Sequence, residues 1–138
     1  MVERDVVIAK AATIERCLAR VAEVRGRGVG ALLPIDVEDI VVLNVTRAAQ
    51  AAADLAAHIV AAEGYGLPDS LAGGFTLLEK QGIIEPALAG KLRAAMGFRN
   101  VAVHSYEAVD SRIVEAIATD HVHDLRRFAA EMVARFAG

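Results

Sequence analysis

The 138-residue chain has no tryptophan, four phenylalanines, two tyrosines, three prolines and one cysteine. Such a scarcity of aromatic residues argues against a β-sandwich or barrel, which needs aromatic and β-branched side chains at alternate positions. A single cysteine, Cys17, excludes an internal disulfide framework and a cysteine-based zinc cluster. Its place in an apolar helical pattern predicts a small core residue. Neither a secretory signal nor a run of about 18 apolar residues is present, so we expect a cytoplasmic protein without a membrane span.

Alanine is the most abundant residue in the chain. The chain has 28 alanines and is 55% hydrophobic, which favours helices that pack closely. Disorder is unlikely for a chain with a mean hydropathy of +0.40. Fifteen Lys and Arg against eighteen Asp and Glu give a net charge of −3, so a nucleic-acid role would have to rest on a local site rather than on bulk charge. The length fits one domain, residues 1–138.

Apolar residues at three- and four-residue steps predict helices at about 2–25, 36–63, 70–81, 86–103 and 111–136. Asp36, Ser70 and Asp110 are expected as N-caps, and Pro86 as the first residue of its helix. These short connections predict an all-α, antiparallel four- to five-helix bundle.

The glycine-rich stretch at 26–30 is expected to be a flexible connection. It lacks the preceding strand and the following Lys-Ser/Thr pair that a phosphate-binding loop requires. Just after it, Leu32, Leu33 and Ile35 are expected to pack against the bundle.

Polar residues gather in one segment, 97–106. Arg99, Asn100, His104 and Tyr106 lie at the end of a predicted helix, just ahead of the next cap. Asn100 and His104 share a helical face, whereas Arg99 lies about 140° around the axis from His104. The helix must therefore end or bend near residues 103–105 if Arg99 and His104 are to act on one ligand.

The pattern Arg99-x-x-x-x-His104-x-Tyr106 resembles the signature of the HepT-like branch of the HEPN superfamily, the toxin half of HepT/MntA toxin–antitoxin pairs. The resemblance covers nearly the whole chain. Ser105 is a small departure, because an acidic residue is more usual there. The other segments that carry the resemblance are Ile14–Leu18, Asn44, Ala48–Gln50, Asp54–Ile59, Gly82–Ile84, Leu88-Ala89 and Met96–Asn100.

The resemblance implies a HEPN-like bundle that acts as a homodimer and a metal-independent endoribonuclease, the toxin of a type VII toxin–antitoxin system, with no cofactor. In such enzymes the 2′-hydroxyl of RNA attacks the adjacent phosphate. Histidine titrates near neutral pH and suits proton transfer, so His104 is assigned as general acid or base. The guanidinium fork of Arg99 would clamp the phosphate, and Asn100 would orient the histidine or the RNA.

A separate role is implied for Tyr106. In this family the antitoxin is a minimal, MntA-like nucleotidyltransferase that transfers AMP from ATP to the motif tyrosine. An AMP group near Arg99 would add negative charge and bulk where the RNA phosphate must bind.

Simpler interpretations of the motif remain open at this point. Arg99 could be a surface arginine, His104 and Asn100 could cap the helix end, and Tyr106 could pack its ring under the last helix. The alternative function is a non-catalytic helical subunit that binds a nucleotide or a partner protein.

Other polar pairs have metal-ligand spacing but are expected to be structural. Asp54 and His58 are expected to contact each other, and His121 and His123 to lie on a solvated face. A helical-bundle metalloprotein is therefore a weaker third option. Asn44 and Gln50 are expected to bond between helices or to lie at a dimer interface. A further set of basic residues is expected to be mainly ordinary exposed charge, with the edge of an RNA groove as the alternative: Lys91, Arg93, Arg112, Arg126 and Arg127.

Overall fold

A computed structural model describes residues 1–26 and 32–138, and every regular element in those ranges is helical. The expected connection at 26–30 falls largely outside the described residues. The helices are α1 (Arg4–Gly26), α2 (Pro34–Glu63), α3 (Gly73–Lys80), α4 (Pro86–His104), α5 (Ser111–Ala116) and α6 (Val122–Phe136). A 3₁₀ turn, η1 (Tyr106–Ala108), follows α4, and a π-helical turn, η2 (Ile117–His121), joins α5 to α6.

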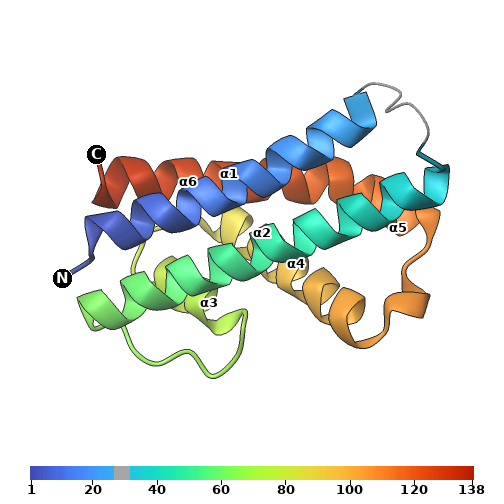
Figure 1. Cartoon of the computed structure of the whole chain (residues 1–138). Coiled ribbons are helices and arrows are strands. Elements are labelled where there is room, and N and C mark those ends of the chain that lie inside the picture. Colours follow the sequence, from blue (N-terminus) through green and yellow to red (C-terminus); the bar gives the residue numbers. More distant parts are fainter. Residues whose placement is uncertain (27–31) are drawn as a thin grey trace.

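The helices form one bundle in which sequential long helices run antiparallel (Figure 1). The two termini lie at one end. The start of α2, the end of α4 and the start of α5 lie at the other end. The predicted all-α antiparallel bundle is therefore confirmed.

The core lies where α2 meets α1, α4 and α6. Small side chains let the backbones approach closely, since α2 buries Ala48, Ala49 and Ala52 completely. Larger groups fill the rest, and the rings of Phe75 and Phe128 meet edge to face at 5.2 Å. By length and composition α2 could span a membrane, but 61% of its most apolar 18-residue window is buried within the bundle, as is usual for a core helix.

The start of α2 differs from the prediction. The helix begins at Pro34, so Asp36 is the third helical residue rather than the cap, and its carboxylate accepts a 3.0 Å hydrogen bond from the Leu33 N–H. Proline is favoured at the first helical position because it has no N–H to satisfy. The expected packing at this point is also wrong: Leu32, Leu33 and Ile35 are 38%, 61% and 56% exposed.

The start of α3 also differs from the prediction. Ser70 does not cap the helix, which begins three residues later behind Ala72, and no side chain caps it. Gly74 is buried against α2, where an added Cβ would lie 3.1 Å from the Cβ of Ala56. A glycine at this position lets α3 pack directly on α2.

We therefore expect Gly74→Ala to lower the free energy of unfolding by about 1–3 kcal/mol, because the added methyl group overpacks the α2–α3 contact. Gly90→Ala is the matched control in α4. Gly90 is exposed and an added Cβ would meet only the end of the Arg93 side chain at 3.9 Å, so alanine should raise stability by up to about 1 kcal/mol. Urea unfolding of both variants measures the difference, and equal effects would contradict this account.

Two other predicted helix starts are confirmed. Pro86 is the first residue of α4, and the carboxylate of Asp110 accepts hydrogen bonds from the Arg112 and Ile113 N–H groups, both at 3.0 Å. The helix that Asp110 caps is not regular through to its end, because η2 interrupts it. Within that turn the Thr119 hydroxyl bonds to the carbonyls of Glu115 and Ala116, a competition that commonly distorts helices.

Candidate active site

The polar segment predicted from sequence lies at the end of α4. Buried Phe98 and Ala102 hold one face of the helix against the bundle, and the last residue of the helix is His104. Ser105 leaves the helical conformation with φ −148° and ψ 53°, and η1 follows at once. The helix thus ends within the predicted interval of residues 103–105, but only after His104, so Arg99 and His104 both lie within α4.

Arg99 is half-buried and reaches along the helix surface. Its Nη1 donates a 3.2 Å hydrogen bond to Oδ1 of Asn100, the next residue. Its Nε is buried without a hydrogen-bond partner in the described parts of the chain. Among residues 1–26 and 32–138 no carboxylate forms an ion pair with Arg99, so the guanidinium keeps its charge available to an anion.

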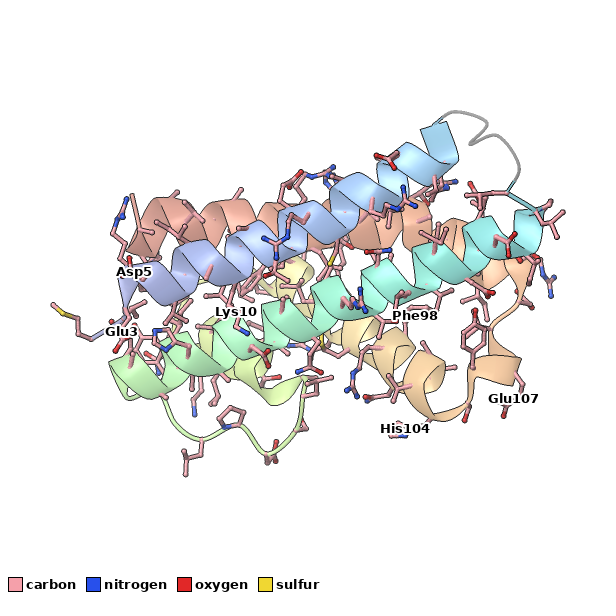
Figure 2. The ribbon with its side chains drawn as sticks, viewed as in Figure 1. Glu3, Asp5, Lys10, Phe98, His104 and Glu107 are labelled. Atoms are coloured by element: carbon pink, nitrogen blue, oxygen red, sulfur yellow. The ribbon has the colours of Figure 1, made fainter. Side chains whose placement is uncertain are left out.

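His104 is exposed and projects from the outer side of α4, away from the other helices (Figure 2). Asn100 is one helical turn before it, a separation that places the two side chains on one face. Because Arg99 bonds to Asn100, the amide of Asn100 connects the arginine to the face that carries the histidine. Arg99 and His104 themselves lie about 140° apart around the axis of α4, because the helix continues through His104.

Tyr106 does not pack under the last helix. It is 46% exposed, and its hydroxyl donates a hydrogen bond to Oδ1 of Asp39 in the first turns of α2. This bond, together with desolvation and the charges of Asp39 and Glu38, raises the pKa of Tyr106 to about 12. Nothing in the sequence pairs Asp39 with a residue 67 positions away.

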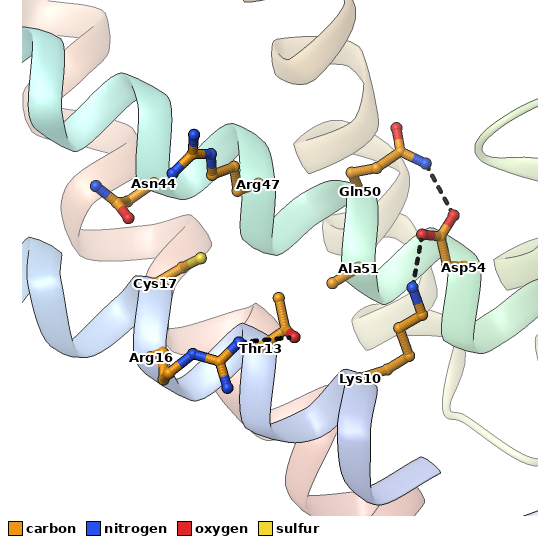
Figure 3. A pocket seen from close by; sticks show the side chains of 9 residues that line it. All are labelled: Lys10, Thr13, Arg16, Cys17, Asn44, Arg47, Gln50, Ala51 and Asp54. Carbon is orange, nitrogen blue, oxygen red and sulfur yellow. Dashed lines mark hydrogen bonds and ion pairs between the residues drawn. The ribbon is translucent and has the colours of Figure 1, made fainter. Parts of the chain in front are cut away.

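A polar groove of about 450 Å³ runs between α1 and α2 (Figure 3). Inside it Lys10 Nζ lies 3.2 Å from Oδ2 of Asp54, and Gln50 Nε2 donates to Oδ1 of Asp54 at 2.9 Å. Asn44 Nδ2 donates to the Ile40 carbonyl at 2.8 Å. Asn44 and Gln50 therefore bond within α2, and neither forms the expected bond between helices within the described parts of the chain. Their alternative place at a dimer interface stays a prediction.

The expected contact between Asp54 and His58 is also absent from the described residues. Asp54 is engaged by Lys10 and Gln50, while Nε2 of His58 accepts a 3.1 Å hydrogen bond from the Glu3 N–H. A backbone donor at the start of α1 and a cation within α1 compete successfully with the neighbour one turn away.

Cys17 lines the same groove and is nearly buried, which confirms its predicted place in the core. Burial raises the pKa of its thiol, although the positive charges of Arg47 and Arg16 oppose the shift. The thiolate is the reactive form. We therefore expect Cys17 to react with iodoacetamide more slowly than free cysteine, with the rate rising only at a higher pH, and to react normally in urea. Fast alkylation of the folded chain would contradict this.

The remaining predictions concern residues of α4, α5, η2 and α6. His121 is half-buried against Phe98, with ring centroids 6.1 Å apart, and desolvation lowers its pKa despite Asp124 and Asp120. The predicted solvated face is thus wrong for His121, whereas His123 is exposed.

Four of the five basic residues considered above form ion pairs, which supports ordinary surface charge: Arg93 with Glu79, Arg112 with Asp110, Arg126 with Glu15 and Arg127 with Glu85 and Glu131.

An all-helical bundle with an Arg-x-x-x-x-His-x-Tyr segment at a helix end is the arrangement of a HEPN-type ribonuclease. The family model described as Ribonuclease HepT-like matches residues 14–132. The chain belongs to this HepT-like ribonuclease family and is a ribonuclease of the toxin–antitoxin class, so the non-catalytic alternative is set aside.

Individual relatives agree with this assignment. The mRNA nuclease HepT of Shewanella oneidensis is 36% identical over 124 residues, which cover 90% of this chain and 93% of the relative. A solved toxin–antitoxin complex with AMP-PNP contains a chain with a TM-score of 0.85 and 34% identity, covering 94% of this chain and 98% of that one. The tri-AMPylated Shewanella oneidensis HEPN toxin in complex with the MNT antitoxin also gives a TM-score of 0.85, with 35% identity and the same coverage.

Proposed function

We propose that this chain is a metal-independent endoribonuclease toxin that cleaves RNA through attack of the 2′-hydroxyl on the adjacent phosphate. The observation that carries the proposal is the makeup of the last two turns of α4. They hold a guanidinium without a carboxylate partner in the described chain and an exposed imidazole, and Asn100 bonds to the first and shares a helical face with the second. The Shewanella oneidensis relative is named as an mRNA nuclease, which supports RNA as the substrate.

In this mechanism Arg99 binds the scissile phosphate and stabilises the charge that develops as the 2′-oxygen attacks. His104 transfers the proton, either from the 2′-hydroxyl or to the leaving 5′-oxygen. Asn100 accepts a hydrogen bond from Arg99 and so fixes the guanidinium relative to the histidine. The products are a 2′,3′-cyclic phosphate and a 5′-hydroxyl, and no metal ion or cofactor takes part.

A homodimer would provide the second proton-transfer group, with His104 of each copy acting on one RNA. Apolar side chains left exposed near the motif support this assembly. Leu33, just before α2, is 61% exposed, Ile35 and Leu43 in the first half of α2 are 56% and 48% exposed, and Val103 at the end of α4 is 50% exposed. Burying such groups against a second copy removes apolar surface from water.

The antitoxin proposed for this chain is an MntA-like nucleotidyltransferase in the cytoplasm that transfers AMP to Tyr106. The related toxin found tri-AMPylated in complex with its MNT antitoxin supports this. Tyr106 is exposed and lies two residues after His104, so an attached AMP would place negative charge beside the cation that must bind RNA.

The test uses the purified chain, single-stranded RNA and an excess of chelator. The expected result is cleavage that gives 2′,3′-cyclic phosphate and 5′-hydroxyl ends, and that stops after incubation with the partner nucleotidyltransferase and ATP. Cleavage that requires a divalent metal, or that leaves other ends, would refute the mechanism.

A further inference from the structure

Asp39 occupies a position that the proposed activity leaves unexplained. It lies on α2, and its Oδ1 accepts the hydrogen bond from the Tyr106 hydroxyl. The oxygen that would receive AMP is thus already bonded to a carboxylate of the toxin itself, whereas the tyrosine ring is 46% exposed to an incoming partner.

We propose that Asp39 is the general base for modification of Tyr106, so that the toxin supplies a catalytic group for its own inactivation. This inference rests on the proposed transfer of AMP to Tyr106. The co-reactant is a nucleoside triphosphate, held by the nucleotidyltransferase that binds the toxin.

The step balances in atoms and electrons. The Tyr106 Oη forms a bond to the α-phosphorus, and the bond from that phosphorus to the oxygen bridging it to the β-phosphorus breaks. Pyrophosphate leaves with the electron pair of the broken bond. The proton of the hydroxyl moves to the Asp39 carboxylate, which returns it to water.

The local charges determine when the proton moves. The hydrogen bond to Asp39 and the nearby charge of Glu38 keep the phenol protonated before the reaction, consistent with a pKa of about 12. Tyr106 is therefore not present as a free phenolate before the transfer begins. As the oxygen bonds to phosphorus it becomes far more acidic, and a carboxylate already in hydrogen-bonding contact can accept the proton without rearrangement.

The test compares Asp39→Asn with wild type in the complex with the cognate nucleotidyltransferase, with ATP and magnesium. Asparagine keeps an oxygen that can accept the hydroxyl hydrogen bond, but it cannot take up the proton. We expect the maximal rate of AMP incorporation to fall by roughly 10²-fold or more. The KM for ATP should stay near the wild-type value, because the partner holds the nucleotide. Asp39→Glu should recover part of the rate.

Glu38→Gln is the matched control, since it removes a neighbouring negative charge but leaves the hydrogen bond to Tyr106 in place. It should be modified at close to the wild-type rate. RNA cleavage by the unmodified Asp39→Asn chain and its thermal unfolding should match wild type.

The outcomes separate this inference from the proposed function. Asp39→Asn modified at the wild-type rate overturns the base and leaves Tyr106 as the acceptor. If Asp39→Asn loses AMP transfer and RNA cleavage to the same extent, Asp39 serves only to hold η1 in place, and its role as a general base is also overturned. A Tyr106→Phe chain that still takes up AMP, or a wild-type chain that takes up none, refutes the proposed modification and this inference with it.

Discussion

Replacing His104 with alanine is expected to slow RNA cleavage by roughly 10²- to 10⁴-fold, the usual contribution of a positioned acid or base. Binding of RNA should change far less, because the guanidinium of Arg99 remains. The loss should therefore appear in kcat rather than in KM. Initial rates on a short RNA with chelator present measure it, and growth of cells expressing the chain without antitoxin gives an independent readout.

The matched control is His123→Ala, which removes another exposed histidine, from α6 rather than from the motif. This variant should cleave RNA and inhibit growth like the wild type. If His104→Ala retains wild-type activity, the proton transfer belongs to another group and the proposed mechanism is wrong. Thermal unfolding of both variants separates a loss of chemistry from a loss of fold.

Helix ends show what local sequence can determine. Pro86 and Asp110 act through their own backbone geometry and through N–H groups two or three residues away, so their roles could be predicted. Ser70 has the same chemistry but does not cap α3, which begins at Gly73 and packs Gly74 closely against Ala56 of α2. A contact between residues 18 positions apart in sequence leaves no signal in a local pattern.

The candidate site also combines residues whose arrangement the local sequence predicts with a contact that only the fold brings about. The motif on α4 and the turn after His104 were predictable, since spacing along one helix fixes the relative directions of Arg99, Asn100 and His104. Asp39 could not be paired with Tyr106, because the two side chains meet only when the folded bundle brings η1 within reach of the first turns of α2.

Predictions between polar neighbours failed for a related reason. Asp54 and His58 have the spacing for a contact within α2, but Lys10 of α1 and the N–H of Glu3, just before α1, bind them instead. A helical spacing shows which side chains can meet, whereas the outcome depends on which donors the neighbouring helix brings.

Substitution of Arg99 is expected to separate activity from stability. Arg99→Met should lower cleavage by roughly 10²- to 10³-fold, as does loss of one group that stabilises the developing charge. Arg99→Lys should also be impaired, because an ammonium keeps the charge but lacks the planar fork that can bind two phosphate oxygens. Cleavage rates and RNA binding at several salt concentrations measure both effects, with Arg93→Met, an arginine of α4 paired with Glu79, as the control.

The stability of Arg99→Met should not fall together with its activity. The buried Nε of Arg99 has no partner in the described chain, and an unsatisfied buried donor costs about 1–3 kcal/mol. Methionine has a similar length without that donor, so Arg99→Met should unfold at the same or a higher urea concentration than wild type. A marked loss of stability would show that the fold itself needs the arginine, and the phosphate-clamp assignment would lose its support. An inactive but equally stable variant means that the cation is kept for a ligand, since no carboxylate of the described chain pairs with it.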